Sequence, residues 1–469
     1  MPPPALPNAK LHRRRLLALA AAAPLAACAG APSLRDYLGG DDGSLQRSIL
    51  GSRNPLTHTE RSALLTTLPP AESTDALQRQ FVLQQALSES PLAFGNKATL
   101  LRDGSGAFPA MFQAMQQARD HINMEYFIFQ DAAWQGLKLS DVLIERMQHG
   151  VAVNIVYDSF GSNTTPASLF DRLRRAGARV VEFDPLNPLQ AHTGWDPNHR
   201  DHRKILVVDG RIGFTGGINF DPVYENPPSA GIPANGDMGH AYWRDTAIRI
   251  EGPAVAELQK LFFATWKQQK GPPAAPARYF PPLPRVGVQT IRIIGSAPDD
   301  QRPLLYISLM TAVLSAMKNV WFSTGYFVPP HGEREDLGRT ARAKVDVRLV
   351  LPSHADVPAT VYAARAAYGD LLEDGAHIYE MQNAVLHSKL ATIDGVWSVV
   401  GSSNLDRRSV VFNNEVDAVI LGHETASQVE ALLRQDMSES HEITLAKWRA
   451  RSLEERLHEM EARVWQYWM

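Results

Sequence analysis

Two long stretches of the chain carry the same succession of apolar patterns. In each, a segment with helical spacing leads into an apolar strand. Both strands contain a Tyr-Phe pair, whose tyrosine is Tyr126 in the first stretch and Tyr326 in the second. A second apolar strand, a helix ending at a Gly-Ala step and a short strand follow. The predicted helices are 111–118 and 304–317, and the predicted strands are 122–129 and 151–157, then 320–328 and 345–351. Strands that alternate with helices predict sheets covered by helices, so we expect duplicated α/β units.

Composition divides the chain at two further places. Six prolines fall between Pro272 and Pro284, and proline disfavours both helices and central strands, so residues 271–287 are predicted to be a linker. Residues 28–92 are rich in small and polar residues and predict a spacer with room for one short helix. The expected domains are therefore residues 93–270 and 288–469.

The overall composition is that of a globular protein of two or three domains. The chain has 469 residues, of which 44% are hydrophobic and 21% charged. The formal charge of −3 argues against a protein that coats DNA or RNA. A single cysteine excludes both a disulfide framework and a structural zinc site within one chain.

The first 27 residues predict a signal peptide. Four basic residues between Lys10 and Arg15 precede a short apolar run that ends in Leu-Ala-Ala-Cys at Cys28. This ending resembles the lipobox of bacterial lipoproteins, in which the cysteine is acylated and the chain is cut before it. We therefore expect an exported lipoprotein anchored in the membrane on the periplasmic side of the cell envelope. A simple secretory signal is the alternative, and either the general or the twin-arginine export route fits. Cleavage removes four positive charges and no acid, which takes the formal charge to −7.

The strongest chemical signal is a motif that occurs once in each unit. A histidine is followed by lysine after two residues, aspartate after seven and asparagine after seventeen, with identical spacing in both copies. One copy alone would be weak, but two copies inside a wider repeat are poorly explained by chance. The copies are His202, Lys204, Asp209 and Asn219, then His387, Lys389, Asp394 and Asn404.

The spacing predicts a hairpin that brings these side chains together. A step of two in a strand places histidine and lysine on one face, and Asp-Gly after the apolar run is a turn signal. The returning strand would carry the asparagine back to the pair, past glycines that let an anion approach the backbone. Asp209 and Asp394 have two open interpretations: they support the site indirectly, or they only build the turn.

A pocket with two such sets suits a phosphodiester. Lysines and amides would neutralise and hydrogen-bond the non-bridging oxygens. One imidazole can attack phosphorus while the other protonates the leaving oxygen. This scheme requires no metal and no cofactor, and we expect neither.

The paired motifs resemble those of the phospholipase D superfamily, from about Ala93 to the C-terminus. Residues 156–162, 198–219 and 243–253 look most like bacterial cardiolipin synthases. The resemblance implies two tandem α/β/α sandwich domains, related by a pseudo-twofold axis, with the active site at their seam.

The resemblance also implies a role for each motif residue. His202 would be the nucleophile that forms a phosphohistidine, and His387 would be the general acid and then the base. Asp245 and Glu415 match the acidic residues that orient the histidines in related enzymes. Residues implied to bind the phosphoryl group are Lys204, Lys389, Asn219, Asn404 and Ser402, the last of which has Gly217 as its counterpart in the first half.

The leading function is phosphatidyl transfer, in which two molecules of phosphatidylglycerol give cardiolipin and glycerol. A phospholipase D that hydrolyses phospholipids to phosphatidic acid shares the same chemistry and is the first alternative. A nuclease of the superfamily is opposed by the acidic charge, and no nucleic acid partner is expected. A non-catalytic scaffold on this fold would usually have lost a motif residue, and none is missing.

Overall fold

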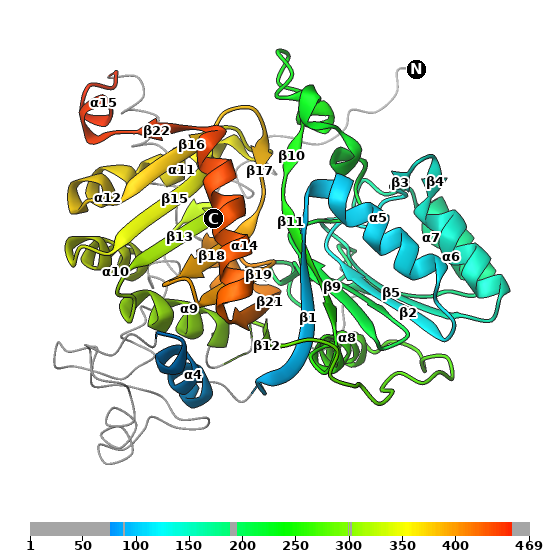
Figure 1. The fold of residues 1–469 in the computed structure, drawn as a ribbon. Coiled ribbons are helices and arrows are strands. Elements are labelled where there is room, and N and C mark those ends of the chain that lie inside the picture. The colour runs from blue at the N-terminus through cyan, green and yellow to red at the C-terminus, as the bar shows by residue number, and fades with distance from the viewer. Residues whose placement is uncertain (1–75, 88–89, 188–194, 299, 301–302, 453–469) are drawn as a thin grey trace, which may run out of the picture.

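The computed structural model describes residues 76–87, 90–187, 195–298, 300 and 303–452, which form two similar halves side by side (Figure 1). The predicted signal peptide and Cys28 lie outside the described residues. Among those described, no helix has the length and apolar character needed to cross a bilayer.

The two halves share one continuous sheet. Each half contributes a series of strands in equivalent order, and the series meet where β1 pairs antiparallel with β12. In the first half the order outward is β1 (Ala93–Arg102), β11 (Thr246–Glu251), β9 (Ile212–Gly216), β8 (Lys204–Val208), β2 (His121–Tyr126), β5 (Ala152–Asp158) and β6 (Arg179–Phe183). In the second half it is β12 (Gln289–Ser296), β21 (Asn413–Leu421), β19 (Trp397–Gly401), β18 (Lys389–Ile393), β13 (Asn319–Thr324), β15 (Asp346–Pro352), β16 (His377–Met381) and β22 (Ser440–Ile443).

Helices cover both faces of this sheet. One face carries α8 (Val255–Gln268) and α14 (His423–Ser438), whose apolar residues share a core that spans both halves. The opposite face carries α5 (Asp103–Gln116), α6 (Leu139–Gln148) and α7 (Ala167–Ala176) in the first half. Its helices in the second half are α9 (Leu304–Leu314), α10 (His331–Arg342) and α12 (Tyr368–Asp374). The predicted architecture of two α/β/α sandwiches is confirmed.

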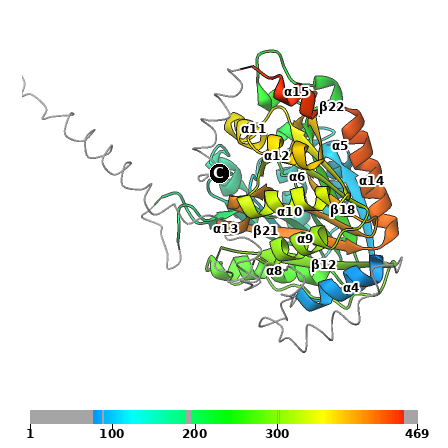
Figure 2. The ribbon, with the colours of Figure 1, turned by 90° about the vertical axis from the view of Figure 1, so that its left-hand side faces the viewer.

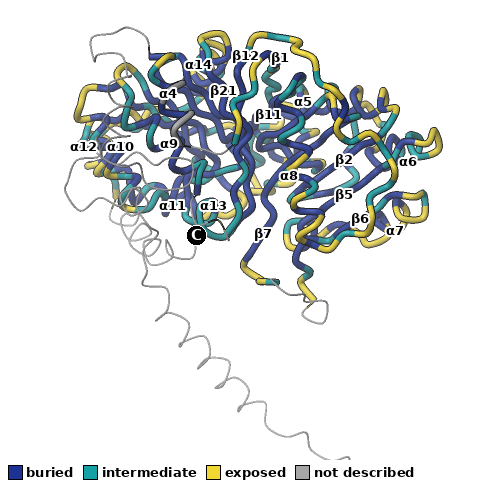
Figure 3. The backbone as a smooth tube through the Cα atoms, turned by 90° about the horizontal axis from the view of Figure 1, so that it is seen from below, coloured by how far each residue is buried: buried dark blue, intermediate teal, exposed yellow. Residues whose placement is uncertain are grey.

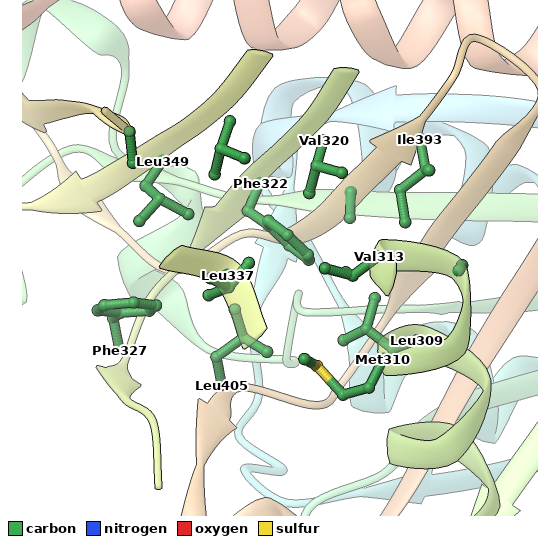
Figure 4. Packing of buried hydrophobic residues seen from close by; sticks show 14 of the residues in the cluster. Leu309, Met310, Val313, Val320, Phe322, Phe327, Leu337, Leu349, Ile393 and Leu405 are labelled. Carbon is green, nitrogen blue, oxygen red and sulfur yellow. The ribbon is translucent and has the colours of Figure 1, made fainter. Parts of the chain in front are cut away.

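Successive side chains of a strand point to opposite faces, and both sets are apolar in the central strands, which explains why both faces are covered. In β8, Leu206 and Val208 pack toward α5–α7, whereas Ile205 and Val207 pack toward α8. The central strands are accordingly buried along their length, while α6 and α7 expose their outer faces (Figure 3). Phe322 of β13 packs in the equivalent core of the second half, near Val313 and Met310 of α9 (Figure 4).

The strands predicted over 122–129 and 320–328 end earlier than expected. β2 stops at Tyr126, and the second strand breaks at Gly325 before the short β14 (Phe327–Val328). A Cβ on Gly325 would lie 2.9 Å from the Cα of His387, so glycine is needed where the chain passes this close to the motif. The residues after both strands consequently reach the pocket.

The segment predicted to be a spacer includes a helix that packs on the second half. α4 (Ala76–Leu87) lies against α9, with Leu83 in the core of the second half (Figures 1 and 2). Gln84 accepts a hydrogen bond from Ser308, and its backbone carbonyl accepts one from buried Arg292. These twelve residues therefore belong to the folded body, although they precede the first half in sequence.

Short elements complete the described chain and lie mostly around the site. The strands are β3 (Ala133–Trp134), β4 (Leu137–Lys138), β7 (Arg200–Asp201), β10 (Trp243–Arg244), β17 (Val385–Leu386) and β20 (Leu405–Asp406). The helices are η4 (Pro222–Glu225), η5 (Pro228–Ala230), η6 (Met238–His240), α11 (Pro358–Arg365), α13 (Arg407–Val411) and α15 (Leu445–Arg449).

Candidate active site

Both motifs form the hairpin that their spacing predicts. β8 pairs antiparallel with β9, and β18 pairs in the same way with β19. Asp209 and Gly210 have φ of 52° and 61°, and Asp394 and Gly395 have φ of 54° and 66°. Positive φ at both central residues is the requirement of the tight turn that matches strand twist. Each histidine consequently stands just before the strand that holds its lysine.

Asp209 and Asp394 lie at the turn end of these hairpins, and their carboxylates bind the backbone. Asp209 accepts hydrogen bonds from the N–H groups of Arg119, Asp120 and His121, which lead into β2. Asp394 accepts equivalent bonds from Met317, Lys318 and Asn319, which lead into β13. The two motif aspartates, for which indirect support of the site and turn building were both open, therefore join each hairpin to the neighbouring strand, and neither lines the pocket.

Replacement of Asp209 by alanine should destabilise the fold rather than disable the chemistry. It removes acceptors from three N–H groups and places alanine at positive φ, at a cost of about 3 kcal/mol. Asp209→Asn keeps one oxygen and a residue that tolerates this φ, so its loss should be about 1 kcal/mol. Urea unfolding and activity per folded molecule are the measurements. A strong loss of turnover in folded, stable Asp209→Asn would contradict this assignment.

Two short strands of the first half pair with strands of the second half and bring each histidine beside its acidic partner. β7 of the first half pairs with the start of β21, and His202 N donates to Asn414 O at 3.0 Å. β10 of the first half pairs with β17 of the second, and His387 N donates to Arg244 O at 2.9 Å. His202 is thus held beside Asn414, the residue before Glu415. His387 is held in the same way beside Arg244, the residue before Asp245.

The two imidazoles face one another with a carboxylate behind each. Their ring centroids are 6.5 Å apart and the ring planes make an angle of 77°. His202 Nδ1 lies 3.1 Å from both oxygens of Glu415, and His387 Nδ1 lies 2.8 Å from Asp245 Oδ2. The acidic residues therefore pair crosswise, since Glu415 of the second half holds the histidine of the first, and Asp245 does the converse.

These contacts define the tautomer of each ring. Because an ionised carboxylate only accepts hydrogen bonds, Nδ1 carries the proton and Nε2 is left with a lone pair. Burial alone would raise the pKa values of Glu415 and Asp245, but their contacts with the histidines hold both below the ordinary range. Both carboxylates are consequently ionised where the site operates.

The histidines are neutral in the resting site. Burial lowers the pKa of His202 to about 4, although Glu415 opposes the shift. Burial and the Lys389 ammonium also lower the pKa of His387, against the pull of Asp245. A neutral His202 is suited to attack. A phosphodiester anion would raise the pKa of His387 on binding and so favour its protonated, acid form.

Each motif lysine is buried and binds the backbone of its own histidine. Lys204 Nζ donates to His202 O at 2.6 Å, and Lys389 Nζ donates to His387 O at 2.5 Å. Burial lowers the pKa of Lys204 to about 7 and also lowers that of Lys389. Burial thus makes both ammonium groups easier to deprotonate than that of a free lysine, and a bound anion would oppose this shift.

The predicted phosphate-binding side chains separate into two groups. Asn219 and Asn404 both line the pocket, and Asn404 Oδ1 has no hydrogen-bond partner among the described residues. Ser402 differs from our expectation, because its buried hydroxyl donates to Glu415 Oε2 and accepts from Val416 N. It therefore supports the carboxylate that holds His202 and does not reach the pocket.

A cavity of about 470 Å³ opens above the two histidines. This volume is within the range of small-molecule sites. Aromatic rings flank the imidazoles: Phe127 lies 5.1 Å from His202, and Trp243 lies 5.5 Å from His387, between ring centroids. The wall near His202 also includes Arg200 and Arg408. The site thus combines aromatic and apolar side chains with polar and charged ones, as a ligand with a charged headgroup and apolar chains would need.

The sequence did not point to several of these side chains. Trp243 and Tyr224 contact His387, but they come from a two-residue strand and a single 3₁₀ turn that leave no periodic pattern. Asn413, whose amide donates to Glu415, was likewise missed. Within the described ranges, no three His, Cys, Asp or Glu side chains are grouped as a metal site would require.

Comparison with known proteins agrees with this geometry. The sequence matches the family described as "Cardiolipin synthase, PLD-like domain" over residues 111–225 and 309–437. It is 31% identical to a cardiolipin synthase of Alkalihalophilus pseudofirmus over 390 residues, 82% of this chain and 75% of the relative. It is 32% identical to a probable cardiolipin synthase of Bacillus subtilis over 368 residues, 78% of this chain and 71% of the relative.

A solved structure shares the fold. The crystal structure of a phosphatidylserine synthase from Haemophilus influenzae superimposes with a TM-score of 0.59 and 12% identity, covering 83% of this chain and 97% of that one. At this identity the likeness bears on the fold alone.

Proposed function

The chain belongs to the family of phospholipase D-like proteins described as "Cardiolipin synthase, PLD-like domain", and from this premise we propose that it is a cardiolipin synthase. It would transfer a phosphatidyl group from one phosphatidylglycerol to a hydroxyl of another, releasing glycerol. The observation that carries the proposal is the pair of facing imidazoles, each held at Nδ1 by a carboxylate of the other half.

The reaction would proceed in two displacements. His202 Nε2 attacks phosphorus while His387 gives its proton to the departing glycerol oxygen, which leaves a phosphohistidine. His387 then takes the proton of the incoming hydroxyl, whose oxygen displaces His202. Asn219, Asn404 and the two lysine charges would stabilise the phosphoryl oxygens during both steps.

The cavity also suits the amphipathic form of a phospholipid. Phe160 and Val357 line it yet are 54% and 46% exposed, so apolar surface borders the opening. Acyl chains could rest against such a border while the headgroup enters. A phosphodiester polymer has no acyl chains to place there and would be repelled by the acidic charge of the chain, so we expect no nucleic acid substrate.

Purified protein incubated with labelled phosphatidylglycerol tests the proposal. Separation of the lipids should show cardiolipin and released glycerol in equal amounts. Phosphatidic acid as the main product would instead identify a hydrolase, and cleavage of DNA with no lipid product would identify a nuclease. No product from any of these substrates would refute the assignment.

We also propose that Cys28 is acylated and that the mature protein is anchored on the periplasmic side of the cell envelope. Cys28→Ser should move the protein from the membrane to the soluble fraction, because a lipid anchor supplies the affinity that a net charge of −7 does not. Activity on detergent-dispersed substrate should be unchanged. Mass spectrometry of the mature N-terminus is the direct measurement, and an unmodified cysteine there would leave a simple secretory signal.

A further inference from the structure

The two orienting carboxylates obtain their hydroxyl donors from different places. In the second half, Ser402 donates to Glu415. Gly217 is its structural equivalent in the first half, since Gly217 N donates to Thr246 O at 3.0 Å as Ser402 N donates to Val416 O at 2.9 Å. A side chain at this position would have to displace the Asp245 carboxylate, because a Cβ on Gly217 would lie 2.1 Å from Asp245 Oδ1.

Tyr224 brings a hydroxyl to the place where this side chain is missing. It lies in η4, and its OH is 2.9 Å from Asp245 Oδ2 and 3.2 Å from His387 Nδ1. Burial and the charge of Asp245 raise the pKa of this phenol well above its ordinary value, so it keeps its proton. Because His387 Nδ1 already directs its own proton to the carboxylate, the phenol donates to Asp245.

We propose that Tyr224 is a positioning residue that takes the place of a serine at position 217 and specialises His387 as the group that exchanges protons with the substrate alcohol. The proposal rests on the proposed function, because it assigns the phenol to the leaving-group side of that reaction. Ser402 would serve the nucleophile His202 in the same manner. The halves thus share one architecture but support their histidines through different donors.

The phenol acts through the charge on the carboxylate. A hydrogen bond to Asp245 withdraws negative charge from the oxygen that faces His387, so the imidazolium gives up its proton more readily. The other charged groups that act on this ring are Lys389 and Lys204, whose ammonium groups also favour proton release. Without the phenol, the pKa of His387 should rise and the ring should be a weaker acid.

Tyr224→Phe tests this role with substrates that differ only in the leaving alcohol. Phosphatidylglycerol needs a proton on its departing oxygen, whereas phosphatidyl-p-nitrophenol does not, since p-nitrophenolate leaves unprotonated. The variant should lose up to about tenfold in kcat with phosphatidylglycerol, the most that a change of one unit in the pKa of a general acid can produce. It should lose less than about threefold with the nitrophenyl ester. The fall in activity at high pH, where His387 loses the proton that it donates, should occur about one pH unit higher in the variant.

Matched variants separate this effect from a loss of packing. Tyr368→Phe removes the hydroxyl of another fully buried tyrosine, which donates to Glu380 outside the site, and should leave both substrates unaffected. Ser402→Ala should slow both substrates equally, because it acts on the nucleophile. The methionine side chain in Tyr224→Met fills much of the space of the ring but has no hydroxyl. This variant must therefore show the same larger loss with phosphatidylglycerol than with the nitrophenyl ester as Tyr224→Phe.

The experiment separates failure of the role proposed for Tyr224 from failure of the proposed synthase function. Equal losses of Tyr224→Phe on both substrates, an unmoved pH profile, or disagreement between the phenylalanine and methionine variants would overturn the role of Tyr224. If the wild-type protein hydrolyses both lipids but makes no cardiolipin, the synthase assignment fails while the comparison of leaving groups still stands.

Discussion

His202→Ala should lower phosphatidyl transfer by at least about four orders of magnitude, because it removes the atom that bonds to phosphorus. His387→Ala should cost about two to four orders, the usual contribution of a general acid and base. The two losses differ in kind as well as size. With phosphatidyl-p-nitrophenol, whose leaving group needs no proton, His387→Ala should still form the phosphohistidine, and His202→Ala should not.

The covalent step can be observed directly. The His387→Ala variant is mixed with phosphatidyl-p-nitrophenol labelled at phosphorus and quenched rapidly. The label should then be found on the protein, in the peptide that contains His202. The phosphoramidate should be lost in acid and survive in base. Label on His387 in the His202→Ala variant would reverse the two roles, and equal residual turnover in both variants would defeat the mechanism.

Local geometry was predictable from the sequence because it depends on short spacings. The step of two from His202 to Lys204 and the Asp-Gly turns determine a hairpin, and the hairpin brings the asparagines back to the histidines. The succession of strands and helices in each half likewise predicted a sheet covered by helices. These features follow from backbone periodicity, which a single sequence displays.

The crossed pairing could not be predicted in this way. Asp245 and Glu415 were identified as orienting residues, but their partners depend on β7 and β10, strands of two residues that pair with the other half. So short a strand has no detectable period. The roles of Ser402 and Tyr224 depend on which way one hydroxyl points, and spacing carries no information on that.

The crossed pairing makes a prediction about the two carboxylates. Glu415→Gln should impair the histidine of the other half, because the amide can donate to His202 Nδ1 and so drive the proton onto Nε2, where it blocks attack. Asp245→Asn should impair His387 because it removes the negative charge that stabilises the protonated imidazole. Each variant should lose about three to four orders of magnitude in kcat, as in other sites where an amide replaces the carboxylate behind a catalytic histidine.

The pH profiles should distinguish the two sides. The Asp245 carboxylate stabilises the His387 imidazolium, so its loss lowers the pKa of that ring. Because the ring acts as an acid only below its pKa, the active range of Asp245→Asn should end at lower pH, opposite to the shift expected for Tyr224→Phe. Nitrogen NMR of labelled histidine should show the tautomer of His202 reversed in Glu415→Gln. An unchanged tautomer, or a change at His387 in that variant, would mean that each half serves its own histidine and that the halves do not depend on one another for catalysis.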